Sequence, residues 1–177
     1  MRKTIILLLC ILYGINLKAQ KGEPSGFHIG LGLEGALPSR GFNVNYSGGA
    51  GATLRLSKGI TENFGATITS GAIAFFPKTR NNPTVTNKAS LFIPIKAGAK
   101  LQLSESLYLL GELGVTLLKS YIINGGTNIS PTFGYVNNSY FTYAPSIGAD
   151  FSGVDVSLRY ENLHGSGFVA LRAGYNF

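Results

Sequence analysis

The sequence of 177 residues contains no tryptophan, a single cysteine and few charged side chains. Cys10 lies in an N-terminal segment that we expect to be removed, so the mature protein should contain no thiol and no disulfide, which excludes cysteine catalysis. Charged residues make up only 13% of the chain, which disfavours a helical bundle or a water-coated globule. Beyond the N-terminal segment, no apolar run reaches the roughly 20 residues that a membrane-spanning helix needs.

Residues 1–19 are typical of a secretory signal peptide. They begin with two basic residues, Arg2 and Lys3, continue with the short apolar run Ile5–Tyr13, and end on a small residue. This run is too short for a transmembrane helix. We therefore expect the segment to be cleaved and residues 20–177 to form one exported domain.

Neither charge nor motifs indicate a nucleic acid or a cofactor. The chain carries 15 basic and 8 acidic side chains, and removal of Arg2, Lys3 and Lys18 lowers the excess from +7 to +4. This excess is too mild to indicate a nucleic-acid partner. With two histidines, no mature cysteine and no dinucleotide or phosphate fingerprint, the chain offers no transition-metal cluster, and we expect no cofactor.

The mature chain instead repeats an alternation of apolar and polar residues. Between Ser90 and Leu103 every odd residue is apolar, whereas Lys96, Gly98 and Lys100 fall between them. Successive side chains of a strand point to opposite faces, so each such segment has one apolar face and one polar or glycine-rich face. Eight segments follow this pattern: residues 27–34, 46–57, 64–76, 90–103, 107–117, 141–151, 154–161 and 169–177. In lipid only helices and closed barrels satisfy their backbone, so the pattern predicts an all-β, eight-stranded antiparallel up-and-down transmembrane β-barrel.

The connections alternate in length, as expected of outer-membrane barrels with short periplasmic turns and longer external loops. The short ones are residues 58–62, 104–106 and 152–153, and the long ones are residues 37–45, 77–87, 122–139 and 162–166. Both termini would then lie in the periplasm. Aromatic residues near the strand ends form expected interface girdles, with Tyr46 facing lipid at the outer rim. A soluble barrel such as a lipocalin is the alternative, but the aromatic strand ends and the glycine-rich opposite face disfavour it.

Three segments carry a resemblance to a known family. The closing segment Phe168–Phe177 alternates hydrophobic residues and ends on an aromatic one, and Phe92–Gly98 and Tyr143–Gly148 are also similar to the family. On these residues the chain resembles the small, porin-like outer-membrane β-barrel domains, which include relatives of OmpX and of the OmpA membrane domain. The resemblance implies a bacterial outer-membrane protein, with Tyr175 and Phe177 in a C-terminal signal read by the barrel-insertion machinery. It implies no chemistry, so we expect a monomeric, non-enzymatic protein with a structural or surface-interaction role.

Most of the charge of the mature chain falls on the inward faces of the predicted strands. These residues are Glu34, Arg55, Lys96, Lys100, Glu112, Asp150, Asp155, Arg159, Glu161 and Arg172. One interpretation is a selectivity ring in a narrow pore for ions or small solutes. The interpretation that we favour is a packed network of ion pairs, because an eight-stranded barrel is just wide enough for its own side chains to fill it.

Two further groups of residues suggest contacts or chemistry outside the lumen. His164 lies two residues from Ser166, with Glu161 nearby, which faintly resembles the hydrolytic trio of lipid A deacylases, although Gly167 stands where that family has Asn. A lipid A-modifying hydrolase is therefore a distant alternative. In the expected external loops, basic side chains could contact lipopolysaccharide phosphates; they are Arg40, Lys78, Arg80 and Lys88.

Overall fold

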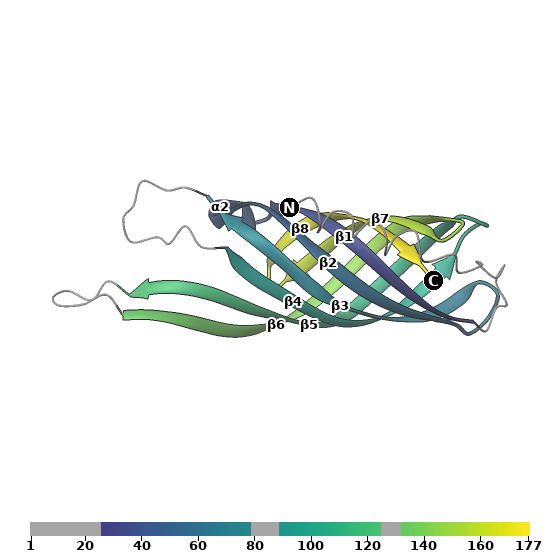
Figure 1. The fold of residues 1–177 in the computed structure, drawn as a ribbon, viewed down its shortest axis with the longest axis horizontal. Helices are drawn as coiled ribbons and strands as arrows, with labels where there is room; N and C mark the ends of the chain where they lie inside the picture. Colours follow the sequence, from purple (N-terminus) through teal and green to yellow (C-terminus); the bar gives the residue numbers. More distant parts are fainter. Residues whose placement is uncertain (1–25, 79–88, 125–131) are drawn as a thin grey trace, which may run out of the picture.

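The computed structural model describes residues 26–78, 89–124 and 132–177 of the protein, and they form a closed antiparallel barrel (Figure 1). The elements are β1 (Phe27–Ser39), α2 (Phe42–Asn45), β2 (Tyr46–Gly59), β3 (Phe64–Pro77), β4 (Ser90–Gln102), β5 (Leu107–Asn124), β6 (Thr132–Phe151), β7 (Val154–Leu163) and β8 (Ser166–Asn176). Each strand pairs with its neighbours in the sequence, and β1 also pairs with β8. The predicted fold class is therefore confirmed.

The closing seam joins the two ends of the chain. Along it, Gly30 of β1 faces Asn176 of β8, and Ser39 faces Gly167. The backbone N–H of Phe177 donates to the carbonyl oxygen of Ile29 at 2.8 Å, which extends the pairing one residue beyond β8. Closure removes free sheet edges from the barrel wall, and the strands cross the barrel axis obliquely, as closure of an eight-stranded sheet requires (Figure 1).

The two faces of the wall differ in the way that the alternation predicts. Apolar side chains cover the outside, where Leu33 is 72% and Phe141 64% exposed. Polar and charged side chains on the alternate positions are buried inside, for example Lys96 and Arg172. A surface of this kind would be unfavourable in water but suits a hydrocarbon environment.

The short turns lie at the end of the barrel where β1 begins and β8 ends. Ser152 and Gly153 connect β6 to β7, and both have positive φ, 53° and 93°. This conformation matches the right-handed twist of paired strands. Because the N–H of Asn176 donates to the carbonyl oxygen of Gly153, the described C-terminal end lies at this same end of the barrel (Figure 1).

Three of the predicted outer loops were wrong in extent, and the two at the C-terminal half of the chain are shortened by strands. Residues 122–139 were expected to be a loop, but β5 continues to Asn124 and β6 begins at Thr132, so the two strands project past the barrel as a long hairpin (Figure 1). The alternation is lost here because Asn137, Asn138 and Ser139 are all exposed; outside a lipid layer, no apolar face is required. The predicted loop 162–166 is also shorter, since His164 and Gly165 alone form the turn between β7 and β8.

The predicted first loop, residues 37–45, is largely ordered structure. β1 continues to Ser39, and the four-residue helix α2 follows after Arg40 and Gly41, which both have positive φ. No periodicity marks so short a helix. The helix brings Phe42 to a cluster of buried aromatic rings inside the barrel, Phe75, Phe92 and Phe168, which we call the aromatic core. The centre of the Phe42 ring lies 5.3 Å from that of Phe75.

The prediction that Tyr46 faces lipid was also wrong. The pairing of β2 with β3 shifts register between Tyr46 and Gly48, as in a β-bulge. An extra residue reverses which side chains point inward. Tyr46 therefore packs on the aromatic core, and its hydroxyl donates to the hydroxyl of Ser90 at 3.0 Å.

Candidate functional site

The most distinctive feature of the lumen is a layer of buried charge. Eight of the charged residues predicted to face inward are at most 4% exposed. Four are carboxylates and four are cations: Glu34, Glu112, Asp155, Glu161, Arg55, Lys96, Arg159 and Arg172. The layer is thus neutral when all are ionised, and an ionised group away from water requires such a partner.

Arg159 of β7 is the centre of the first half of this layer. Its Nη1 and Nη2 atoms donate to the two carboxylate oxygens of Glu34 at 3.0 and 2.7 Å, and its Nε lies 3.1 Å from Oε2 of Glu161. This bidentate geometry is the strongest form of the arginine–carboxylate pair. One guanidinium thus holds two carboxylates that come from β1 and β7.

Lys96 of β4 extends the first half across the barrel. Its Nζ atom lies 2.9 Å from Oε2 of Glu161 and 3.3 Å from Oε2 of Glu112. The hydroxyls of Thr116 and Thr142 donate to the other oxygen of Glu161 at 3.2 and 3.3 Å. Side chains from β4, β5 and β6, together with Arg159 of its own strand β7, therefore converge on the carboxylate of Glu161.

Asp155 of β7 is the centre of the second half. It accepts from Nη1 of Arg172 at 2.5 Å and from the hydroxyl of Tyr108 at 2.6 Å, and Nη1 of Arg55 lies 3.5 Å away. The hydroxyl of Thr53 joins the two halves, because it accepts from Nε of Arg172 and donates to Glu34, both at 3.1 Å. The sequence did not single out Tyr108 or Thr53, and both lie at inward positions of their strands.

Lys100 and Asp150, also predicted to face the lumen, lie apart from the layer. Both are half-buried towards the end with the short turns, and neither forms an ion pair within the described residues. The ammonium of Lys100 lies 4.1 Å from the centre of the Tyr108 ring. Asp150 accepts from Nδ2 of Asn176 at 2.6 Å and from the backbone N–H of Gly153 at 3.1 Å.

An aromatic core fills the lumen between the charged layer and the outer mouth. Phe75, Phe92 and Phe168 are fully buried, and the ring centre of Phe75 lies 4.8 Å from that of Phe92 and 5.0 Å from that of Phe168, both in edge-on contacts. Phe42 of α2 and Tyr46 pack on them from the mouth. Phe75 is an aromatic residue at an inward position of β3, and this core is where its ring packs.

The structure does not bring the proposed hydrolytic trio together. Glu161 points into the lumen, where it is held by Lys96 and Arg159. His164 is exposed at the turn, and within the described residues no hydrogen bond joins it to Ser166 or Glu161. A nucleophile needs an adjacent base that a third group orients, and these contacts do not supply one.

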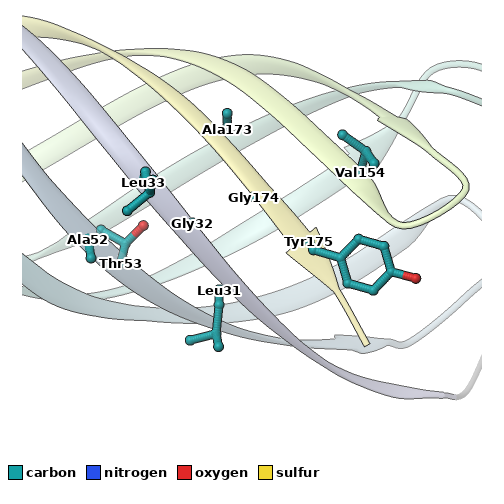
Figure 2. A pocket seen from close by; sticks show the side chains of 9 residues that line it. All are labelled: Leu31, Gly32, Leu33, Ala52, Thr53, Val154, Ala173, Gly174 and Tyr175. Atoms are coloured by element: carbon teal, nitrogen blue, oxygen red, sulfur yellow. The ribbon is translucent and has the colours of Figure 1, made fainter. Parts of the chain in front are cut away.

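A shallow apolar groove marks the outer wall at the closing seam (Figure 2). Small residues of β8, Ala173 and Gly174, lie between the larger side chains of β1, Leu31 and Leu33, and Val154 of β7. Among its lining residues only Thr53 and Tyr175 carry a polar side-chain group, and no charged residue lines the groove. Its form suits an acyl chain, and it carries no chemistry.

The remaining predicted residues are the basic residues of the expected loops and the proposed assembly signal. Arg40 and Lys78 are exposed at the mouth of the barrel, whereas Arg80 and Lys88 lie outside the described residues. The rings of Tyr175 and Phe177, the proposed assembly signal, stack edge-on at 5.0 Å.

Among residues 26–78, 89–124 and 132–177, no group of three or more His, Cys, Asp or Glu side chains could hold a metal ion. Over the same ranges, no helix has the length and apolar character needed to cross a bilayer.

A closed eight-stranded barrel with an apolar exterior and an interior of balanced charges defines the class of the small outer-membrane β-barrels. The chain has this fold. It is similar to Ail, the attachment invasion locus protein of Yersinia pestis, with a TM-score of 0.61 and 16% identity over 86% of this chain and 99% of that one. It is also similar to the N-terminal β-barrel domain of Pseudomonas aeruginosa OprF, with a TM-score of 0.59 and 10% identity over 85% of this chain and 97% of that one. No family model and no curated sequence matches the chain. The resemblance seen in the sequence is thus confirmed at the level of the fold.

Proposed function

We propose that the protein is an integral protein of the bacterial outer membrane with a sealed lumen and a structural or surface-interaction role. It is exported through a signal peptide cleaved after residue 19, inserted by the barrel-insertion machinery and present as a monomer. The apolar outer wall supports the membrane location, because a barrel in water would expose polar residues there. The observation that carries the sealed lumen is the pair of layers inside it, one of ion pairs and one of aromatic rings.

The two layers disfavour the narrow-pore alternative. A conducting pore needs a continuous water path lined by groups that bind ions weakly enough to release them. Here the largest fully buried side chains include Arg159, Arg172 and Phe92, which block the barrel at two levels. Opening a path would require breaking buried ion pairs and moving the aromatic core.

Purified protein in planar lipid bilayers is expected to show no stable conductance. The physical reason is that the charged layer and the aromatic core fill the cross-section of the barrel. Single-channel recording checks this, with a large-pore porin in the same bilayer as the control. Reproducible open-channel steps from the purified protein would instead support the pore.

The projecting β5–β6 hairpin supports the surface-interaction role. The pairing of β4 with β5 ends at Lys119, and the pairing of β6 with β7 ends at Thr142, so the described part of the hairpin beyond these residues pairs only with itself (Figure 1). A two-stranded ribbon with free edges can receive an extended segment of another molecule. Binding residues commonly lie on such projections from a rigid scaffold.

The hairpin is expected to be exposed at the cell surface. An epitope that replaces residues 125–131 should be labelled by antibody on intact cells, since the strand ends that it joins, Asn124 and Thr132, lie at the end opposite the short turns. The same epitope in the turn at residues 104–106 is the matched control and should be labelled only after the outer membrane is permeabilised. The reverse pattern would show that the orientation is inverted.

Basic residues at the mouth are proposed to contact lipopolysaccharide. Arg40 and Lys78 are exposed there, and Arg80 and Lys88 follow Lys78 in the sequence. Lipopolysaccharide presents phosphates, whose charged oxygens accept hydrogen bonds from arginine and lysine side chains. Ail, which shares the fold, has been solved in complex with the heparin analogue sucrose octasulfate.

A further inference from the structure

A second cavity, of about 140 Å³, lies inside the outer mouth of the barrel and takes no part in the sealed lumen below it. It is lined by Phe42 of α2, Phe92 of β4, Leu118 of β5 and Tyr140 of β6, together with residues of the β7–β8 turn. Phe42, Leu118 and Tyr140 are half-buried against the aromatic core, so the floor of the cavity is one face of that core.

The cavity is separated from the bilayer by the barrel wall. Leu117 of β5 is exposed on the outside, whereas the next residue, Leu118, faces inward into the cavity. Neighbouring side chains on a strand point to opposite faces. A molecule must therefore enter from the aqueous side of the mouth, which excludes the acyl chain of a membrane lipid as the natural occupant.

Polar groups meet the cavity at one side. His164 and Ser166 flank Gly165 at the β7–β8 turn, and both line the cavity. His164 has a φ of 47°, a conformation that a non-glycine residue adopts at an energetic cost. Within the described residues, neither side chain is engaged in a hydrogen bond, so both remain available to a ligand.

We propose that this cavity binds a small neutral molecule with one aromatic ring and one hydroxyl group, such as a phenol. An apolar protein cavity of about 150 Å³ holds one benzene ring, so the volume here suits a single ring. The walls of Phe42, Phe92 and Tyr140 supply the faces and edges with which aromatic rings pack favourably. Imidazole and serine hydroxyl groups each donate and accept hydrogen bonds, as does a phenolic hydroxyl.

The test uses the full mature protein in lipid nanodiscs, titrated with phenol by calorimetry, with empty nanodiscs subtracted. Wild-type protein is expected to give a saturable one-site signal. Leu118→Trp should weaken binding at least tenfold, because the larger side chain occupies the cavity. Leu117→Trp is the matched control, since it adds the same side chain on the outer face of the same strand and should leave binding unchanged.

A second set of measurements tests the polar side. The double variant His164→Gly and Ser166→Ala is expected to bind phenol about three- to tenfold more weakly, the effect of a lost hydrogen bond. Glycine at position 164 keeps the turn, since it accepts positive φ without strain. In the wild type, toluene and cyclohexanol should both bind more weakly than phenol.

Three results would overturn the proposal. Phenol uptake that does not saturate above the empty-nanodisc background would show partition into lipid. Equal binding by Leu118→Trp and Leu117→Trp, with both variants showing the circular dichroism of a folded barrel, would place any site elsewhere. Toluene bound as tightly as phenol would remove the role of His164 and Ser166.

Discussion

Replacing Arg159 with methionine is expected to lower the free energy of unfolding by about 3–5 kcal/mol, the cost of breaking a buried ion pair by removing one partner. The guanidinium of Arg159 makes two hydrogen bonds to Glu34 and a third contact with Glu161. Without it, Glu34 keeps only the hydroxyl of Thr53 as a described partner. Urea-induced unfolding of the barrel in lipid vesicles measures the change.

Two controls separate this effect from a general loss of positive charge. Lys119→Met removes an exposed cation from β5 and is expected to change the free energy by no more than about 0.5 kcal/mol. The double variant Arg159→Met and Glu34→Gln removes the orphaned charge as well and should regain most of the loss, because Glu161 still has Lys96. The role given to the ion pairs would be contradicted if Arg159→Met lowered the free energy of unfolding by less than about 1 kcal/mol, which is the effect of an ordinary substitution. It would also be contradicted if the double variant were no more stable than the single one.

Deleting Phe177 is expected to leave only a minor part of the protein in the outer membrane, with the rest misfolded in the periplasm. The proposed reason is that the insertion machinery reads the aromatic end of the closing strand, where Phe177 stacks on Tyr175 and extends the seam by its hydrogen bond to Ile29. Quantitative immunoblotting of outer-membrane and periplasmic fractions measures the effect.

Two variants and one assay with purified protein distinguish an assembly signal from a contact that merely stabilises the folded barrel. Phe177→Tyr keeps an aromatic end and should assemble normally. Phe151→Ser removes another exposed aromatic at the same rim and should also assemble, which sets the girdle apart from the signal. The protein lacking Phe177 should still fold spontaneously in lipid vesicles, where no machinery is present. Normal outer-membrane levels after the deletion would count against the signal.

The alternation of apolar and polar residues predicted the strands correctly where one face meets lipid and the other meets the lumen. The prediction failed in segments outside the barrel wall. Along β4 every outward position is apolar, and the predicted segment 90–103 agrees with Ser90–Gln102 to within one residue. Above the membrane, both faces of the β5–β6 hairpin can be polar, so the sequence predicted a loop. α2 and the bulge near Tyr46 escaped prediction because each depends on packing against residues distant in the sequence.

The sequence by itself determined which charged residues enter the lumen. Parity along a strand fixes the face of each side chain, so Glu34, Arg159 and Arg172 were placed inside before any partner was known. It did not determine which of them pair. Glu34 faces Arg172 across the β1–β8 seam, where a direct cross-strand pair would be expected.

The tertiary structure decided the pairing differently. Arg172 turns to Asp155, and Glu34 is held instead by Arg159, one strand further along the wall. The reason is curvature: closing the sheet brings the inward side chains of non-adjacent strands within hydrogen-bonding reach, and long guanidinium groups can choose among several carboxylates. Strand alternation is a local property that a sequence records, whereas the partner of a buried charge depends on the register and closure of the whole barrel.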